Sequence, residues 1–288
     1  MNVNERKNVG CFSTTFRDYL LDSSLIVATN NTELYNIKLI DCGNYIQIYS
    51  LDTPKGIKQN SEKRKNILNI NTDTLKKVNH NSKKNNNIEL KNITRSKLEC
   101  QRLAKANCND WETFITLTFE ENITDIDYAN KRLKYFIDKI RRVFPNFKYI
   151  GVPEFQDRGA SHYHLLTNIN INNKNLIFEQ EDKKRYKHIK YWNEGFTKVD
   201  SLKNDIKKII GYISKYMTKD ADIRLFNRHR YFYSRNLIKP KTNYLNLNNP
   251  NHLEFLNNKL NNKQLIYNNV YKNSYNDELI NFFEYNSI

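Results

Sequence analysis

The sequence predicts an α+β fold in which an antiparallel sheet has its helices packed on one face. Two observations lead to this prediction. From residue 114 to residue 219, β-rich runs and segments of helical periodicity follow one another in the order β-α-β-β-β-α. Hydrophobic residues make up 39% of the 288 residues, which is enough to build a core around such a sheet.

A β-hairpin is predicted near the start of the chain, within an N-terminal segment of residues 1–58. The hairpin spans Glu33–Leu51, with its turn at Cys42-Gly43-Asn44. The return run, Tyr45–Tyr49, alternates apolar and polar side chains, as a half-buried strand does.

The next segment, residues 59–93, is rich in Asn, Lys and Ser, a composition that favours a linker or a mobile basic arm. The main domain is expected over residues 94–240, and it begins with a basic helix at Thr94–Asn107. The basic residues of this helix are Arg95, Lys97, Arg102 and Lys105. Residues 241–288 form an Asn- and Tyr-rich tail, to which the sequence assigns no role.

Four strands and two further helices are expected in the main domain. The strands are 114–119, 149–155, 162–169 and 196–199, and the helices are 126–144 and 204–219. On the first of these helices, apolar residues form one stripe that should face the core. The stripe consists of Ala129, Leu133, Phe136, Ile140 and Val143.

The composition favours a polyanionic partner. Lys and Arg number 47 against 31 Asp and Glu, a formal charge of +16, and each phosphate that such residues neutralise releases a counterion. The chain has no G-x-x-x-x-G-K-[ST] loop for ATP. Its four cysteines, Cys11, Cys42, Cys100 and Cys108, form no Cys-x-x-Cys pair. With no apolar run of membrane length and no signal peptide, we expect a reduced protein of the cytoplasm, with no membrane partner.

The strongest chemical signal is the hairpin that carries Glu154, His162 and His164. The tripeptide Asp157-Arg158-Gly159 suits a three-residue hairpin loop, with glycine in the left-handed position. A turn centred on Arg158 places Glu154 opposite His162, and His164 on the same face. Two imidazoles and one carboxylate suit a divalent ion that also binds a substrate.

Two other interpretations of this hairpin stay open. A bulge would shift the register by one residue and bring Gln156 or Phe155 towards the histidines. The histidines could also be ordinary surface residues of a strand, because a His-x-His pattern alone is a weak signal.

The helix expected at 204–219 carries two tyrosines beside two lysines. Tyr212 and Tyr216 are four residues apart and project together, next to an apolar stripe. Lys215 and Lys219 each follow a tyrosine by three residues. A phenol is a poor nucleophile at neutral pH, and a neighbouring cation favours its phenolate. The alternative is an amphipathic helix whose tyrosines line the edge of the core.

Taken together and in order, three motifs resemble the HUH endonucleases, and most closely the replication (Rep) proteins of rolling-circle plasmids and single-stranded DNA phages. The motifs are Phe114–Phe119, His162-Tyr-His164 and Tyr212–Lys219. The run Arg230–Pro240 is also similar to Rep proteins of Gram-positive plasmids and phages. The resemblance covers roughly Thr94 to Pro240.

The resemblance implies an RRM-like antiparallel sheet, the HUH endonuclease fold. It implies Mg²⁺ or Mn²⁺ held by His162 and His164, with Glu154 as the third ligand. It further implies attack by a tyrosine on a phosphodiester of single-stranded origin DNA, which leaves a 5′-phosphotyrosine and a free 3′-OH. Tyr212 is favoured as the primary nucleophile, because Lys215 follows it in the commonest Tyr-x-x-Lys pattern. A host helicase and DNA polymerase in the bacterial cytoplasm are the implied partners.

Single-stranded DNA is expected to meet arginines that lie among aromatic residues, since cations follow phosphates and rings stack on bases. The candidate DNA-binding residues are Arg95, Arg102, Arg228, Arg230 and Arg235. The last three are interleaved with Phe226, Tyr231, Phe232 and Tyr233.

Several alternatives remain at this stage. An HUH relaxase would commonly place its tyrosine before the histidines, and an HUH transposase is usually shorter and pairs its tyrosine with glutamine. A non-catalytic protein could bind nucleic acid on an RRM-like sheet. A metallohydrolase would use water as its nucleophile and would leave no covalent adduct.

Overall fold

The computed structural model describes residues 34–56, 82–156, 158–180, 186–202, 211, 225, 228–273 and 276–287, with the side chains of all of these except 82–91. The described residues fall into two compact units. Unit 1 contains those before residue 57 and after residue 240, apart from the turn Cys42–Asn44. Unit 2 contains those from 82 to 240, together with that turn.

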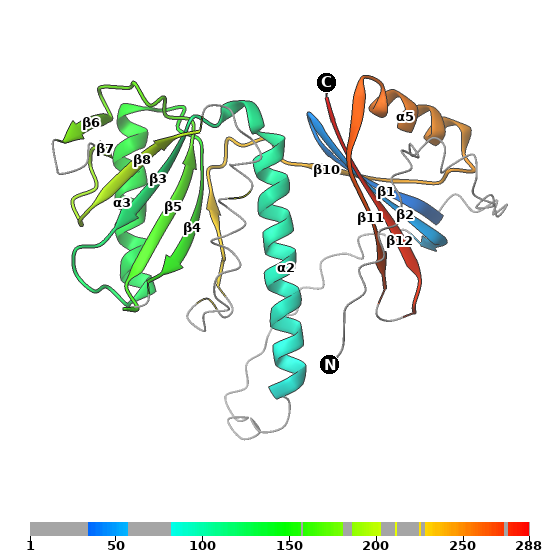
Figure 1. Cartoon of the computed structure of the whole chain (residues 1–288), viewed down its shortest axis with the longest axis horizontal. Coiled ribbons are helices and arrows are strands. Elements are labelled where there is room, and N and C mark those ends of the chain that lie inside the picture. The colour runs from blue at the N-terminus through cyan, green and yellow to red at the C-terminus, as the bar shows by residue number, and fades with distance from the viewer. Residues whose placement is uncertain are drawn as a thin grey trace, which may run out of the picture. The chain divides into compact units, whose positions relative to one another are not determined.

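Unit 2 is built on a five-stranded antiparallel sheet (Figure 1). In spatial order its strands are β8 (Thr197–Ser201), β3 (Thr113–Thr118), β5 (Ser161–Thr167), β4 (Tyr149–Phe155) and β9 (Phe232–Tyr233). A separate hairpin of β6 (Ile177–Gln180) and β7 (Tyr186–Ile189) precedes β8. The strands expected near 114, 149, 162 and 196 are therefore present, and the α+β class with antiparallel sheets is confirmed.

The helix α3 (Ile126–Val143) covers one face of this sheet (Figure 1). It begins where the Asp125 carboxylate accepts hydrogen bonds from two backbone N–H groups of the first turn. Four residues of the expected apolar stripe are buried against odd-numbered strand residues such as Ile115 and Leu165. The assignment of Val143 to that stripe was wrong: its side chain lies in the last turn and is 44% exposed.

The opposite face of the sheet is partly covered by α2 (Ser82–Ala106), so the expectation of helices on one face only was wrong. Cys100, Leu103 and Ala104 of α2 join a buried cluster with Phe114 and Leu166. Successive strand residues point to opposite faces, so Phe114 and Ile115 face different helices. The sequence pattern indicated the apolar stripe of each helix but not the face against which it packs.

The helix α2 also begins earlier than its sequence indicated. It starts at Ser82, so its first turns lie within the segment 59–93 that was expected to be a linker. Lys and Glu are good helix formers, and they offset the Asn content that favoured a linker. A short 3₁₀ helix at Cys108–Asp110 then leads into β3.

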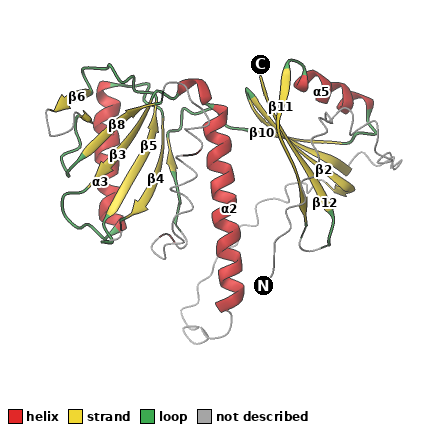
Figure 2. Cartoon of the chain, in the orientation of Figure 1, coloured by secondary structure: helices red, strands yellow, loops and turns green. Residues whose placement is uncertain are grey.

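Unit 1 joins the two ends of the chain in one five-stranded sheet (Figure 2). Its strands, in spatial order, are β10 (Lys241–Leu245), β1 (Leu34–Cys42), β2 (Tyr45–Gly56), β12 (Leu279–Ser287) and β11 (Lys263–Lys272). The helix α5 (Pro250–Leu260) packs on one face through Leu256. The expected N-terminal hairpin is present, and the tail that had no assigned role supplies the remaining three strands.

The helix expected at 204–219, with Tyr212, Lys215, Tyr216 and Lys219, lies outside the described residues. Among the helices that are described, none has the length and apolarity that crossing a membrane requires.

Candidate metal centre

The β4–β5 hairpin brings two histidines and a glutamate together, in the register that the sequence predicted. Glu154 pairs with His162, and Val152 pairs with His164. No register shift interrupts this pairing, so the alternative with a bulge is wrong. Gly159 has φ +87°, the left-handed conformation expected of it in the loop.

The ligand atoms of Glu154, His162 and His164 all lie within 4.8 Å of one another. The Nε2 of His164 is 2.6 Å from Oε2 of Glu154, and their side chains are only 5% and 9% exposed. The two imidazole rings are 5.7 Å apart and nearly perpendicular. Two nitrogen ligands and one carboxylate at this spacing can hold a divalent cation and leave coordination positions for a substrate.

The orientation of His164 is fixed from two sides. Phe114 stacks on its ring, with centroids 5.5 Å apart and planes 17° apart. The Oγ1 of Thr116 lies 3.3 Å from Nδ1 of His164. A threonine hydroxyl can donate or accept a hydrogen bond. Thr116 can therefore support His164 both when Nε2 donates its proton to Glu154 and when Nε2 is a metal ligand with the proton on Nδ1.

Gln156 and Arg158 form a chain of hydrogen bonds that ends on His162. Arg158 Nε donates to Oε1 of Gln156 at 2.9 Å, and Nε2 of Gln156 is 3.2 Å from Nε2 of His162. Arginine has no acceptor atom, so it fixes the amide with its oxygen towards the guanidinium and its NH₂ towards the imidazole. His162 must then accept through Nε2, which is the tautomer that leaves a lone pair for a metal.

The structure places the five candidate DNA-binding arginines apart from this cluster. Arg95 and Arg102 lie on α2, where Arg95 pairs with Glu99 at 2.9 Å. Arg230 is only 7% exposed, whereas Arg235 is exposed. Arg228 binds the carboxylate of Asp127 at the start of α3, and this hydrogen bond lowers the pKa of Asp127.

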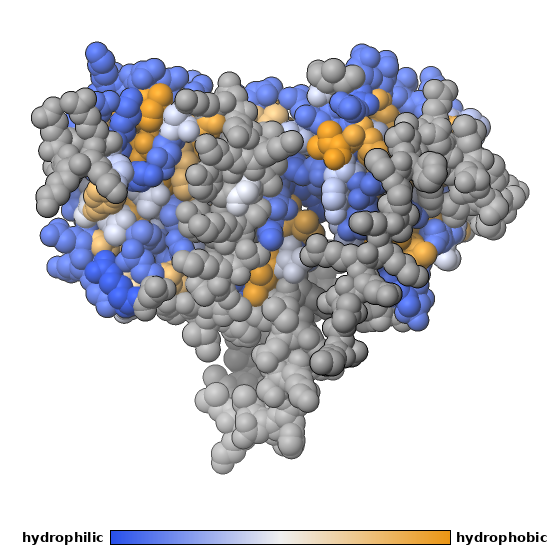
Figure 3. Space-filling view, viewed as in Figure 1, coloured by the Kyte–Doolittle hydropathy of each residue, from blue (hydrophilic) through white to orange (hydrophobic). Residues whose placement is uncertain are grey.

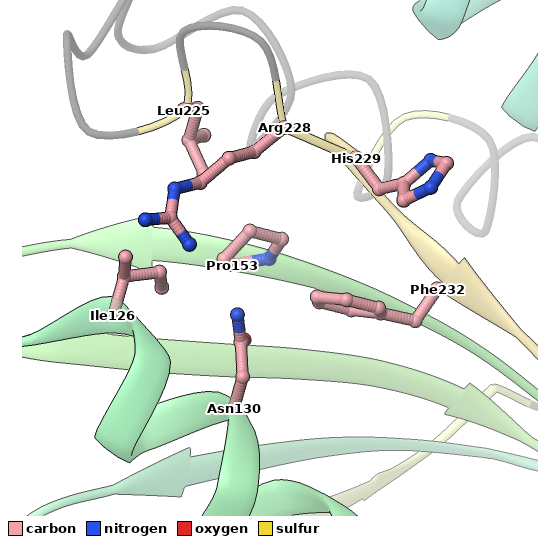
Figure 4. Close-up of a pocket in the computed structure, with 7 residues that line it drawn as sticks. All are labelled: Ile126, Asn130, Pro153, Leu225, Arg228, His229 and Phe232. Atoms are coloured by element: carbon pink, nitrogen blue, oxygen red, sulfur yellow. The ribbon is translucent and has the colours of Figure 1, made fainter.

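Arg228 also lines a pocket of about 250 Å³ on the α3 side of the sheet (Figure 4). The other lining residues are Ile126, Asn130, Pro153, Leu225, His229 and Phe232. Pro153 lies between Val152 and Glu154 in β4, so its side chain points away from the face that carries the histidines. The pocket is therefore not part of the candidate metal centre.

Residues 112–221 match the model of a family described as replication-associated protein ORF2. The matched segment begins just before β3 and contains the whole candidate metal centre. No curated protein and no solved structure matches the chain. The family match supports a role in DNA replication and suggests a replication initiator.

The sequence did not indicate the residues that support the cluster from neighbouring strands. Thr116 and Phe114 reach His164 because β3 pairs with β5, a pairing between segments about 50 residues apart. Hairpin arithmetic works only for strands joined by a tight turn, so it could not have placed them. Gln156 was named only for a shifted register, although it shares the face of Glu154 without any shift.

Proposed function

We propose that the chain is a rolling-circle replication initiator that nicks single-stranded origin DNA by tyrosine attack. The observation that carries the proposal is the convergence of Glu154, His162 and His164 on one sheet face, within a segment similar to a replication-associated family. The HUH assignment, the RRM-like description of the sheet and the nickase domain at 94–240 belong to this proposal. So do the assignments of an origin DNA substrate, a host helicase and a DNA polymerase.

The donor set fits the proposed Mg²⁺ or Mn²⁺. One carboxylate oxygen and two imidazole nitrogens converge, and the threonine hydroxyl behind His164 supports the ligating tautomer. When bound, the ion polarises a phosphoryl oxygen and neutralises its charge. Of the two candidate ions, Mn²⁺ accepts imidazole ligands more readily, which makes it the better probe.

The reaction follows from the proposed nucleophile. The phenolate oxygen of Tyr212 attacks phosphorus, the bond from phosphorus to the 3′ oxygen breaks, and that oxygen leaves as a 3′-OH after taking up a proton. The DNA is then attached through a 5′-phosphotyrosine. Lys215 is proposed to favour the phenolate, and Tyr216 with Lys219 to serve a second transfer that resolves the cycle. Arg95, Arg102, Arg228, Arg230 and Arg235 remain proposed DNA contacts, of which exposed Arg235 is the best placed.

The test uses single-stranded fragments that cover the replicon encoding the chain, with radiolabel at either end. The full-length protein is incubated with them and Mn²⁺, and products are separated on a denaturing gel. We expect one fragment to be cut, with its 3′ portion retained on the protein. EDTA and the variant His162→Ala should abolish the cut, and Tyr212→Phe should abolish the adduct.

Three results would decide between this proposal and the alternatives. Cutting without any adduct, unchanged in the double variant Tyr212→Phe/Tyr216→Phe, would indicate a metallohydrolase. Binding without cutting, unaffected by His162→Ala, would indicate a non-catalytic nucleic-acid-binding protein. Circular dichroism of each variant would separate loss of chemistry from loss of folding.

A further inference from the structure

Phe196 lies on the same row of the sheet as the candidate metal centre. Its carbonyl accepts a hydrogen bond from the backbone N–H of Thr118 at 2.8 Å, and Thr118 pairs with His162. Adjacent strands are about 4.8 Å apart, so Phe196 is two strands, roughly 10 Å, from His162. Lys198, two residues on, pairs with Thr116 and shares this face.

The side chain of Phe196 is exposed but held in place. It is 44% exposed, which is unusual for a phenylalanine beside a catalytic-type cluster. The rings of Tyr186 and His188 contact it nearly at right angles, with centroids 5.8 and 5.3 Å away. His188 is anchored in turn by Thr197, whose Oγ1 lies 3.3 Å from its Nδ1. Figure 3 shows hydrophobic surface among hydrophilic residues where β6, β7 and β8 lie.

A recess of about 600 Å³ adjoins this ring. Its lining includes Phe196, Trp192, Asn193 and Arg158. Arg158 is also the residue that holds Gln156 against His162. An aromatic surface, an amide and a guanidinium thus border one hollow, which adjoins the metal centre through a chain of two hydrogen bonds.

We propose that Phe196 is a base-stacking residue for single-stranded DNA, with the recess beside it seating one nucleotide next to the cut phosphate. This inference rests on the proposed function, since it takes single-stranded DNA as the substrate. Bases stack on exposed aromatic rings, and nearby cations bind the backbone phosphates. Lys198, which lies 5.9 Å from the ring centre of Tyr186, and Arg158 supply those cations on either side of Phe196. The chain's charge of +16 makes a polyanion a better occupant of this aromatic surface than an apolar protein partner.

The test measures binding without cutting, so it does not depend on the nicking reaction. Fluorescence anisotropy of a labelled single-stranded oligonucleotide of mixed sequence is recorded with the full-length protein in EDTA. Loss of one stacked base corresponds to a weakening of about 5- to 150-fold, which we expect for Phe196→Ala. Phe196→Trp should restore binding. The matched control is Phe178→Ala, a residue that is 40% exposed and contacts His188 from β6, for which we expect less than about a 2-fold change.

Unchanged affinity in Phe196→Ala, with a native circular dichroism spectrum, would overturn the proposal. Equal weakening by Phe178→Ala would also overturn it, because the effect would then belong to the whole aromatic surface. Mn²⁺ affinity, measured by calorimetry, should be the same in Phe196→Ala and in the natural chain. If the natural chain forms no covalent adduct but loses DNA affinity on Phe196→Ala, the nickase proposal fails and the stacking proposal stands.

Discussion

At the scale of single residues, the candidate metal centre depends on side chains that fix the two histidines from behind. Thr116 and Phe114 hold His164, and Gln156 with Arg158 holds His162. The amide NH₂ of Gln156 occupies the same Nε2 lone pair that a metal would use. Gln156 therefore competes with the ion at His162 while keeping that ring in the ligating tautomer.

This competition predicts that Gln156→Ala binds Mn²⁺ more tightly. A hydrogen bond of this kind contributes about 0.5–1.5 kcal/mol net, so its removal should tighten binding by about 2- to 12-fold. Isothermal titration calorimetry of Mn²⁺ binding measures the change directly. Arg158→Ala, which frees the amide, should act in the same direction, whereas Glu154→Ala should weaken binding. A weaker site in Gln156→Ala would show instead that the amide is itself a metal ligand.

At this scale the triad could be predicted from the sequence, whereas its supporting residues could not. The positions of Glu154, His162 and His164 followed from one tight turn, whose register depends only on neighbouring residues. Thr116, Phe114 and Phe196 join the site through pairings of β3 with β5 and β8, which arise from the packing of the whole sheet. Local patterns carry no information on such pairings.

At the scale of elements, the turn before β8 positions Phe196 against β3. Gly195 has φ +148°, a conformation that other residues rarely adopt. A Cβ at this position would lie 2.4 Å from the backbone nitrogen of Glu120 and 2.6 Å from the carbonyl oxygen of Thr118. The backbone nitrogen of Glu120 in turn donates to the carbonyl of Glu194 at 2.8 Å. Only glycine allows the two segments to approach this closely.

Gly195→Ala should therefore destabilise unit 2. The strained conformation alone costs about 1–3 kcal/mol, and relief of the clash would separate the turn from β3. Urea denaturation should show a lower midpoint. Gly56→Ala is the matched control, because a Cβ there meets nothing within 4 Å and the change should stay within about 0.5 kcal/mol. Equal midpoints for the two variants would contradict the close approach at Gly195.

The elements also show where periodicity succeeds and fails. The apolar spacing of α3 predicted its buried stripe except in the last turn, where Val143 is exposed. The early start of α2 at Ser82 was missed, because an Asn- and Lys-rich composition carries no apolar stripe from which a helix could be predicted.

At the scale of the whole molecule, tyrosines are buried in the sheet of unit 2, where they resist ionisation. Burial raises the pKa of Tyr231 to about 12 and also raises the pKa of Tyr149 and Tyr163. In the unfolded chain a tyrosine ionises near pH 10, roughly the value of the free side chain. Between these values the unfolded state has lost protons that the folded state retains, so rising pH favours unfolding.

We therefore expect unit 2 to lose stability as the pH rises from about 10 towards 12. Below about pH 9 the contribution of these tyrosines should be constant. The urea midpoint, followed by circular dichroism across this range, tests the expectation. Tyr231→Phe should reduce the slope, whereas Tyr135→Phe, which replaces a residue that is 46% exposed, should leave it unchanged. A midpoint that does not fall above about pH 10 would contradict the burial of these phenols.

The two units of the chain also differ in how much of them the sequence could predict. Unit 2 follows from local elements in chain order, and its class was predicted. Unit 1 joins β1 and β2 to β10, β11 and β12 from the other end of the chain, a closure that no local pattern encodes.

The central claim is that a tyrosine of this chain attacks DNA with the help of an ion held by Glu154, His162 and His164. The most direct test is mass spectrometry of the protein after reaction with origin DNA and Mn²⁺, followed by nuclease and trypsin digestion. The account predicts a peptide that carries a 5′-linked nucleotide on Tyr212 or Tyr216, absent from His162→Ala. A nucleotide on any other residue, or cleaved DNA with no modified peptide, would contradict it.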